Sequence, residues 1–314
     1  MTLSLHPRDT VGGLLHQVAD ILGQRRDEIE RTTSPLYGGV VVPAMNRQYD
    51  LLNLDASSAS HPALLRYYND TISGNTLTKK WTGVGRIVAI IPTDYATPDP
   101  DESRKVLQLQ RPSFGGPTDV NSPQYTIAND GSIYIGSLDR QSLYRVWYTR
   151  SPSPLVSGVV DSATASTLVV DPDADYAQEF DMSSTAYVGD VVRIYEDGAG
   201  QQVARISSFD PSTYTFTLSS LTTVGADALS DTSIGGYAWS IIPWFDPALC
   251  QLLAYLTAFE FADMFDRAKL VGPRVQSLLG RYMNYLEQVD DGTQHQTTLS
   301  KSESPFTEGG SAVY

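Results

Sequence analysis

The chain has 314 residues and a formal net charge of −14, with 22 lysines and arginines against 36 aspartates and glutamates. This length suggests two or three structural units with a substantial hydrophobic core. The acidic balance argues against a protein that wraps nucleic acid, because phosphate binding needs clusters of lysine and arginine. Solubility explains the charge, and so does a channel wall that repels passing DNA.

A single cysteine, Cys250, excludes an intramolecular disulfide, so the fold does not depend on an oxidising compartment. The first residues, MTLSLHPRDT, lack the basic segment and apolar run of a signal peptide, and we expect none. The apolar stretch 249–265 is interrupted by Gln251, Glu260 and Asp263, which predicts a buried helix rather than a membrane span.

The N-terminal part, residues 1–83, is predicted to be mostly helical. Residues 11–22 have apolar side chains at helical spacing, with Asp9 or Thr10 as the N-cap and Gly23 at the stop. His16 is expected at the surface or boundary of this helix.

Further helical signals follow in the same part of the chain. We expect a polar helical segment at 25–32 and a loop at 34–43. Pro62 fits a first helical turn, and the spacing of the apolar residues after it predicts a helix through Leu64, Leu65, Tyr68 and Ile72.

The pattern changes to strands in residues 84–154. Residues 87–91 are a run of Ile, Val and Ala, and residues 92–103 are a loop rich in Pro and Asp. The Asn129-Asp130-Gly131 turn between two short apolar runs predicts a hairpin. Residues 143–148 predict the next strand.

Residues 155–243 predict a small β-barrel or β-sandwich module. Hairpin signals come first, at 157–160 and 167–170. The later runs alternate apolar and polar side chains around turns at Asp197-Gly198 and Asp210-Pro211. Several short strands at this spacing are typical of antiparallel barrels and sandwiches.

The C-terminal region, residues 244–292, returns to helix. Asp246 and Pro247 start a first helix, and Gly272-Pro273 is expected to end it and to start a second one. Their apolar stripes can pack as a helix hairpin or between subunits. The residues that we assign to this packing are Leu253, Leu256, Val275, Leu279, Tyr282 and Leu286.

Residues 293–314 are polar and rich in Ser, Thr and Gly, so they cannot bury enough surface to fold alone. A few apolar residues stand out in this segment and predict either plain terminal disorder or a tail that orders against a partner. These candidate anchors are Leu299, Pro305, Phe306, Val313 and Tyr314.

Motifs for chemistry are weak throughout. Residues 171–175, DPDAD, alternate carboxylates as a calcium loop does, but Tyr176 and Met182 stand where that loop needs Gly and Glu, so an acidic surface turn is the better interpretation. The four histidines, His6, His16, His61 and His295, have no metal-ligand spacing. No nucleophile elbow or phosphate loop appears. We therefore expect no catalytic residue, metal or cofactor.

Two alternatives remain open. Aromatic residues could form a carbohydrate-binding face, as in a tail-fibre or receptor-binding protein, although aromatics in β-rich domains more often lie in a core or interface. A carboxylate pair that acts on polysaccharides is also possible, because such partners meet only in space. The tryptophans concerned are Trp81, Trp147, Trp239 and Trp244.

Two stretches of sequence carry a family resemblance. In residues 125–155, a Tyr precedes the Asp130-Gly131 turn, and a Tyr-containing strand ends in Pro152, Pro154 and Leu155. In residues 189–218, a Gly-Asp strand, a G-x-G-Q turn at 198–201 and a Thr-rich strand follow one another. With the order of helices, β-region, helix pair and tail, the chain resembles the head-to-tail adaptor (connector, head-completion) proteins of tailed bacteriophages.

This resemblance implies a fold and a function. The fold class would be α+β, with a helical adaptor core made of N-terminal helices and a C-terminal helix pair, plus an antiparallel β-region and the β-module. The protein would form a homo-oligomeric ring, a dodecamer, in the virion neck under the portal protein after assembly in the host cytoplasm. Residues 293–314 would dock on the portal. Tail, nozzle or fibre proteins would be further partners, and DNA would be passing cargo.

Overall fold

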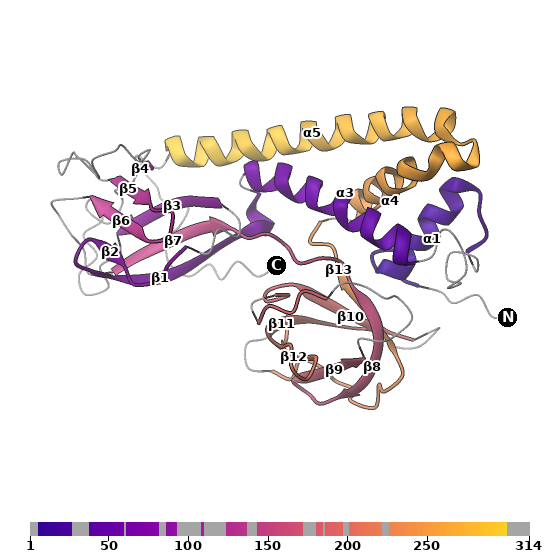
Figure 1. The fold of residues 1–314 in the computed structure, drawn as a ribbon, viewed down its shortest axis with the longest axis horizontal. Coiled ribbons are helices and arrows are strands. Elements are labelled where there is room, and N and C mark those ends of the chain that lie inside the picture. The colour runs from indigo at the N-terminus through magenta and orange to yellow at the C-terminus, as the bar shows by residue number, and fades with distance from the viewer. Residues whose placement is uncertain are drawn as a thin grey trace. The chain divides into compact units, whose positions relative to one another are not determined.

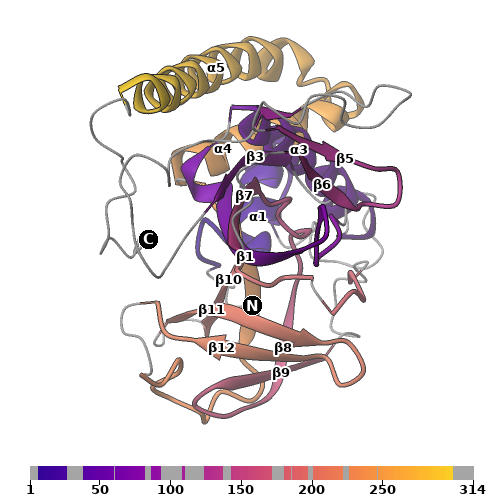
Figure 2. The same cartoon turned by 90° about the vertical axis from the view of Figure 1, so that its left-hand side faces the viewer.

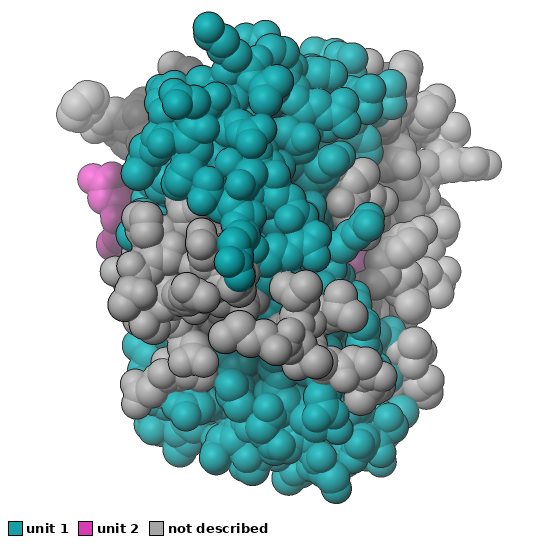
Figure 3. All heavy atoms as spheres, turned by 90° about the vertical axis from the view of Figure 1, so that its right-hand side faces the viewer, with its two compact units in different colours: residues 1–53, 152–314 teal, residues 54–151 magenta. Residues whose placement is uncertain are grey.

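The computed structural model describes residues 6–26, 38–59, 61–81, 86–92, 108–109, 124–136, 143–171, 180–184, 186–196, 201–221, 226–245 and 247–299. The chain forms two compact units, which are coloured in Figure 3. Unit 1 comprises residues 1–53 and 152–314, and unit 2 comprises residues 54–151. Unit 2 is thus an insertion within the sequence of unit 1. The division into five segments stays a prediction.

The predicted fold class, an α+β chain built on a helical adaptor core, is wrong. The described residues contain thirteen strands, in a seven-stranded sheet and a closed six-stranded barrel, beside four α-helices. Sheet therefore organises most of the described part of unit 2 and a large part of unit 1, so the described helices are not the core of both units (Figures 1 and 2). None of the described helices has the length and hydropathy needed to cross a membrane.

The helices of unit 1 are α1 (Val11–Leu22), α3 (Gly38–Ser58), α4 (Pro247–Phe261) and α5 (Ala268–Leu299), and the last residues of α3 belong to unit 2. Helix α4 contacts both α1 and α5. The hydroxyl of Tyr282 on α5 donates to the carbonyl of Leu52 on α3, 2.7 Å away. Thr10 caps the start of α1, and Gly23, with φ 69°, caps its end, so this predicted helix is confirmed.

Helix α3 replaces part of the loop that we predicted at 34–43. Gly38, Gly39 and Pro43 are poor helix formers and hide the pattern. The helix is stabilised by a buried stripe at helical spacing, made of Val41, Met45, Tyr49, Leu52 and Ala56.

The predicted break at Gly272-Pro273 is also wrong, because α5 continues through Pro273. The chain turns earlier, at Asp266, whose φ of 55° is left-handed, after the 3-10 helix η2 (Ala262–Phe265). Pro273 lies inside α5, in its second turn, where it cannot donate the usual backbone hydrogen bond. Helix α5 includes 293–299, and residues 300–314 lie outside the described part of the chain.

Unit 2 is one sheet with the strand order β3-β7-β1-β2-β6-β5-β4, in which β4 and β5 are parallel and the other pairs antiparallel. Its strands are β1 (Leu65–Ser73), β2 (Thr76–Leu77), β3 (Arg86–Pro92), β4 (Gln108–Leu109), β5 (Gln124–Ile127), β6 (Ile133–Gly136) and β7 (Leu143–Thr149). The hairpin predicted at Asn129-Asp130-Gly131 is confirmed as the β5–β6 turn, with Gly131 at φ 82°.

Strand β1 corrects the helix that we predicted through Leu64, Leu65, Tyr68 and Ile72. Every second residue of β1 points inward, but one of these positions is Asp70, which is 4% exposed and hides the alternation. The carboxylate of Asp70 accepts from the N–H groups of Thr71 (2.9 Å) and Lys79 (2.8 Å) and from the hydroxyl of Thr78. A buried charge is tolerated here because its hydrogen bonds are satisfied.

The barrel of unit 1 closes in the order β10-β11-β12-β9-β8-β13. Its strands are β8 (Ser157–Ala163), β9 (Thr167–Asp171), β10 (Val191–Tyr195), β11 (Gln202–Asp210), β12 (Thr215–Ser219) and β13 (Ala238–Ile242). Aromatic rings fill its interior: Phe216 lies 5.5 Å from Trp239 and 5.1 Å from Phe209 between ring centroids. Trp239 and Phe216 are fully buried.

Candidate functional site

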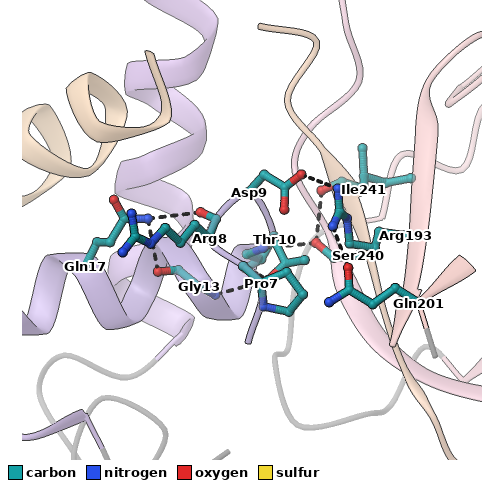
Figure 4. A network of polar contacts seen from close by, with 11 residues as sticks. Pro7, Arg8, Asp9, Thr10, Gly13, Gln17, Arg193, Gln201, Ser240 and Ile241 are labelled. Carbon is teal, nitrogen blue, oxygen red and sulfur yellow. Dashed lines mark hydrogen bonds and ion pairs between the residues drawn. The ribbon is translucent and has the colours of Figure 1, made fainter. Parts of the chain in front are cut away.

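A polar network lies where the N-terminal segment and the start of α1 meet the barrel (Figure 4). We call residues 7–10 the strap. Thr10, the N-cap, accepts from the N–H of Gly13 at 3.2 Å and donates its hydroxyl to the carbonyl of Pro7 at 2.7 Å. The strap is thereby folded back onto the first turn of α1.

Two adjacent glycines allow this close approach. A Cβ at Gly13 would lie 1.9 Å from the carbonyl oxygen of Pro7, and a Cβ at Gly12 would lie 2.7 Å from the ring of His6. Glycine inside a helix costs about 1 kcal/mol relative to alanine. Here the two glycines leave the space in which the strap packs against the helix.

The barrel contributes two side chains from neighbouring strands. Arg193 on β10 and Ser240 on β13 are directly opposite partners in the strand register. Opposite residues of an antiparallel pair lie on the same face, with Cβ atoms roughly 4.5–5.5 Å apart. The register therefore presents a guanidinium and a hydroxyl side by side.

These two side chains bind two positions near the start of α1. Arg193 Nη2 donates to Asp9 Oδ2 at 2.6 Å, and the N–H of Val11 donates to Ser240 Oγ at 3.0 Å. Arg193 Nη1 also donates to Gln201 Oε1 at 2.8 Å, and the Ser240 hydroxyl donates to the carbonyl of Ile241 at 2.9 Å. One ion pair and one backbone cap therefore join the barrel to α1.

The electrostatics of the site favour this arrangement. The side chains of Asp9 and Arg193 are 18% and 21% exposed, so salt screens their attraction less than that of a fully exposed pair. The carboxylate of Asp9 also lies next to the N-terminus of α1, which favours negative charge. Arg193 Nε is buried without a hydrogen-bond partner, which makes the closed arrangement less favourable.

Aromatic side chains extend the network. His6 Nδ1 and the hydroxyl of Tyr195, at the end of β10, are 2.9 Å apart. The ring of His6 also lies 5.0 Å from that of His16, between centroids. His16 is 7% exposed and therefore buried, so its expected position at the surface or boundary is wrong.

This geometry fastens elements of unit 1 together. The contacts of this network join charged or polar groups that hold one another. In the described part of the chain, no group of three or more His, Cys, Asp or Glu residues could hold a metal ion. Asp171, the first residue of the calcium-like stretch, ends β9, and residues 172–179 lie outside the described part.

The predicted packing residues on α4 and α5 lie mostly inside unit 1. Leu253 is fully buried, and Val275, Tyr282 and Leu286 are 6%, 1% and 5% exposed, while Leu256 and Leu279 are half-buried. They stabilise the helices of their own subunit, and their role between subunits stays a prediction. Among the predicted tail anchors, Leu299 is the last residue of α5, and Pro305, Phe306, Val313 and Tyr314 lie outside the described residues.

The four tryptophans do not share a surface. Trp239 is fully buried in the barrel, and Trp244 donates its indole N–H to Asn53 Oδ1 at 2.6 Å. In unit 2, Trp81 packs against the core, while Trp147 lies 4.8 Å from the half-exposed ring of Tyr67. An aromatic face that uses all four residues is therefore not formed.

Sequence reasoning missed Arg193 and Ser240 as partners of the helix start. The one local signal was Gly12-Gly13 within a helical pattern, which indicates that another segment approaches closely. Asp9 was considered only as a cap.

Comparisons with models of protein families, with curated proteins and with solved structures find no match for this chain.

Proposed function

We propose that the protein is a structural, non-catalytic virion protein: a head-to-tail adaptor of a tailed phage that self-associates into a ring, binds the portal protein and joins it to the tail. The proposal starts from the sequence resemblance. One observation in the structure supports self-association. Large apolar side chains are exposed at the corner formed by α4, η2 and α5.

This corner contains Phe259, Met264 and Leu270, which are 49%, 66% and 66% exposed. A Cβ at Gly272 would lie 3.5 Å from Phe259 Cε2, so the ring of Phe259 lies against the start of α5. Grouped exposed apolar side chains mark protein–protein contacts more often than scattered ones do. The corner is therefore the best candidate for a subunit contact.

Charge adds a second argument for association of identical chains. Copies with a net charge of −14 repel one another. The part of α5 up to position 288 differs from the chain average, because it contains Lys269, Arg274 and Arg281 but a single acidic residue, Glu287; Asp290 and Asp291 follow in the last part of the helix. A neighbour that presents an acidic surface to α5 would reduce this repulsion.

The test is assembly of the full-length protein with and without the portal protein of the same virus. Light scattering after gel filtration and negative-stain imaging should show rings with the portal. Met264→Glu combined with Leu270→Glu should prevent ring formation. Met182→Glu, at an exposed methionine of unit 1 outside this corner, is the matched control and should leave assembly unchanged.

A truncation tests the portal contact separately. Removal of residues 293–314 should abolish portal binding and leave the fold intact. Normal docking by the truncated protein would remove the tail assignment, and a wild-type protein that stays monomeric beside the portal would contradict the adaptor role itself.

One observation favours a second candidate, a tail-fibre or receptor-binding protein that recognises carbohydrate. Tyr67 is 52% exposed and lies beside Trp147, with the Arg145 guanidinium 4.8 Å from its ring centroid. Aromatic rings with an adjacent arginine suit a sugar ligand. Saturable glycan binding that Tyr67→Ala abolishes and Tyr134→Ala retains would support this function, and absence of binding across a broad glycan panel would exclude it.

A further inference from the structure

We propose that the strap and the barrel form a latch that opens as one unit. When the Asp9–Arg193 ion pair breaks, Ser240 leaves the N–H of Val11, and the first turn of α1 loosens. This inference concerns the internal mechanics of unit 1 and holds whether or not the protein is an adaptor.

The two bonds of the latch are geometrically coupled. Asp9 and Val11 are two positions apart in the chain, and Arg193 and Ser240 are opposite each other on β10 and β13. The ion pair of 2.6 Å and the cap of 3.0 Å therefore lie side by side. Because Arg193 and Ser240 are paired in the sheet, a movement of these strands that breaks the ion pair also displaces Ser240 from the N–H of Val11.

The first turn of α1 depends on the barrel because its own sequence is a weak helix former. It begins Val11-Gly12-Gly13, and two glycines in succession lower the helix propensity. The first N–H groups of a helix also lack partners within the helix. The hydroxyl of Thr10 accepts from the N–H of Gly13, and the hydroxyl of Ser240 accepts from the N–H of Val11. Val11 is fully buried.

The ion pair of the latch can open because water can replace the partners of both charged side chains. Asp9 and Arg193 retain exposures of 18% and 21%, so both charges reach solvent without large rearrangement. The buried Arg193 Nε has no partner in the closed arrangement and gains one from water on opening. Because α1 packs against α4, the opening connects the barrel with the remaining helices of unit 1.

Hydrogen exchange of the full-length protein, followed by mass spectrometry, tests the latch. Arg193→Gln should speed the exchange of the amides of residues 11–14 by about tenfold or more, as expected for loss of a charged hydrogen bond. Asp9→Asn should give the same acceleration. The variant that combines Asp9→Asn with Arg193→Gln should exchange these amides little faster than either single variant, because both changes open the same latch.

Arg205→Gln is the matched control. Arg205 lies on β11 and donates to the carbonyl of Gly189, just before β10, at 3.0 Å. It should leave residues 11–14 protected. Unchanged exchange in Arg193→Gln, additive effects of the two latch variants, or equal acceleration by Arg205→Gln would each overturn the proposal.

If Arg193→Gln does not fold, a variant in which the two charges are swapped tests the latch instead. Asp9→Arg combined with Arg193→Asp keeps an ion pair of opposite polarity at the same place. It should restore much of the protection that Asp9→Arg alone removes. Failure to restore protection in a folded double variant, checked by circular dichroism, would also overturn the latch.

Discussion

The N–H of Val11 donates to the hydroxyl of Ser240 at 3.0 Å, across 229 positions of sequence. A helix usually obtains its N-terminal cap from residues beside it, as α1 does from Thr10. Here a second cap comes from the final strand of the barrel. The start of α1 is therefore complete only after the barrel has closed, and such non-local contacts form late in folding.

Replacement of Gly13 by alanine should destabilise the protein. Alanine normally stabilises a helix relative to glycine by about 1 kcal/mol. The added methyl would lie 1.9 Å from the Pro7 carbonyl, so the strap must move. We expect a net loss of about 1–3 kcal/mol in the free energy of unfolding, measured by urea titration.

Gly280→Ala is the matched control for this prediction. Gly280 is exposed on α5, and a Cβ there meets no atom within 4 Å. It should stabilise the protein by about 0.4–1 kcal/mol. Equal stabilisation by both substitutions would show that the strap does not pack on α1.

Local signals predicted local structure. The Asn129-Asp130-Gly131 turn was readable because Gly131 needs a positive φ, which glycine adopts without steric cost. The caps of α1 were readable because Thr10 supplies a side-chain acceptor for the first turn and Gly23 adopts a left-handed φ. Strand β1 could not be recognised from the sequence, because the buried Asp70 interrupts the alternation of apolar and polar residues. The strand also pairs with β7, which joins residues about 80 positions apart, such as Leu65 and Thr149.

The candidate site was less predictable than the fold. Arg193 lies 184 positions from Asp9, and its neighbour Ser240 belongs to another strand. Their meeting depends on the register of β10 with β13, which no short motif encodes. Gly12-Gly13 showed that something approaches α1, but the sequence does not say which segment.

Tyr68→Phe should stabilise unit 2. The hydroxyl of Tyr68 is buried without a hydrogen-bond partner, and removal of an unsatisfied buried group gains about 1 kcal/mol. Lys79 Nζ, 5.1 Å from the ring centroid, keeps its contact with the phenylalanine ring. Urea titration should show the gain, with the exposed Tyr134→Phe unchanged as the control.

Tyr68 also predicts alkaline sensitivity. Burial, followed by the charge of Asp70 and by Tyr148, raises the pKa of Tyr68 to about 12. Because the folded-state pKa exceeds the ordinary value of about 10, its contribution to stability is full below pH 10 and is lost as the pH rises towards 12. Tyr68→Phe should reduce this loss, and identical alkaline unfolding of both proteins would contradict the assignment.

Trp239→Ala should act on stability and not on surface binding. Trp239 is fully buried, with Phe216 at 5.5 Å and Phe180 at 5.9 Å between ring centroids. Loss of a buried tryptophan costs about 3–5 kcal/mol. Denaturant unfolding and near-ultraviolet circular dichroism should show this, and the half-buried Trp147→Ala should cost less. An unchanged unfolding midpoint would place Trp239 outside the core.

His61 should make unit 2 sensitive to mild acid. Burial lowers the pKa of His61 below its ordinary value of 6.5. Its Nδ1 accepts from the N–H of Ala63 at 3.2 Å, which requires the unprotonated nitrogen. Because the folded-state pKa is the lower one, the contribution of His61 to stability is complete above pH 6.5. It is lost as the pH falls through the folded-state value.

His61→Asn removes the titration and keeps an acceptor near the same place. Urea midpoints measured from pH 7 to pH 5 should fall more for the wild type than for His61→Asn. The carboxylates of Asp130 and Asp210 do not interfere, because hydrogen bonds from Lys80 and Ser132 and from Ser212 hold their pKa values below the ordinary range. A difference between the two proteins that stays constant with pH would show that His61 does not titrate on unfolding in this range.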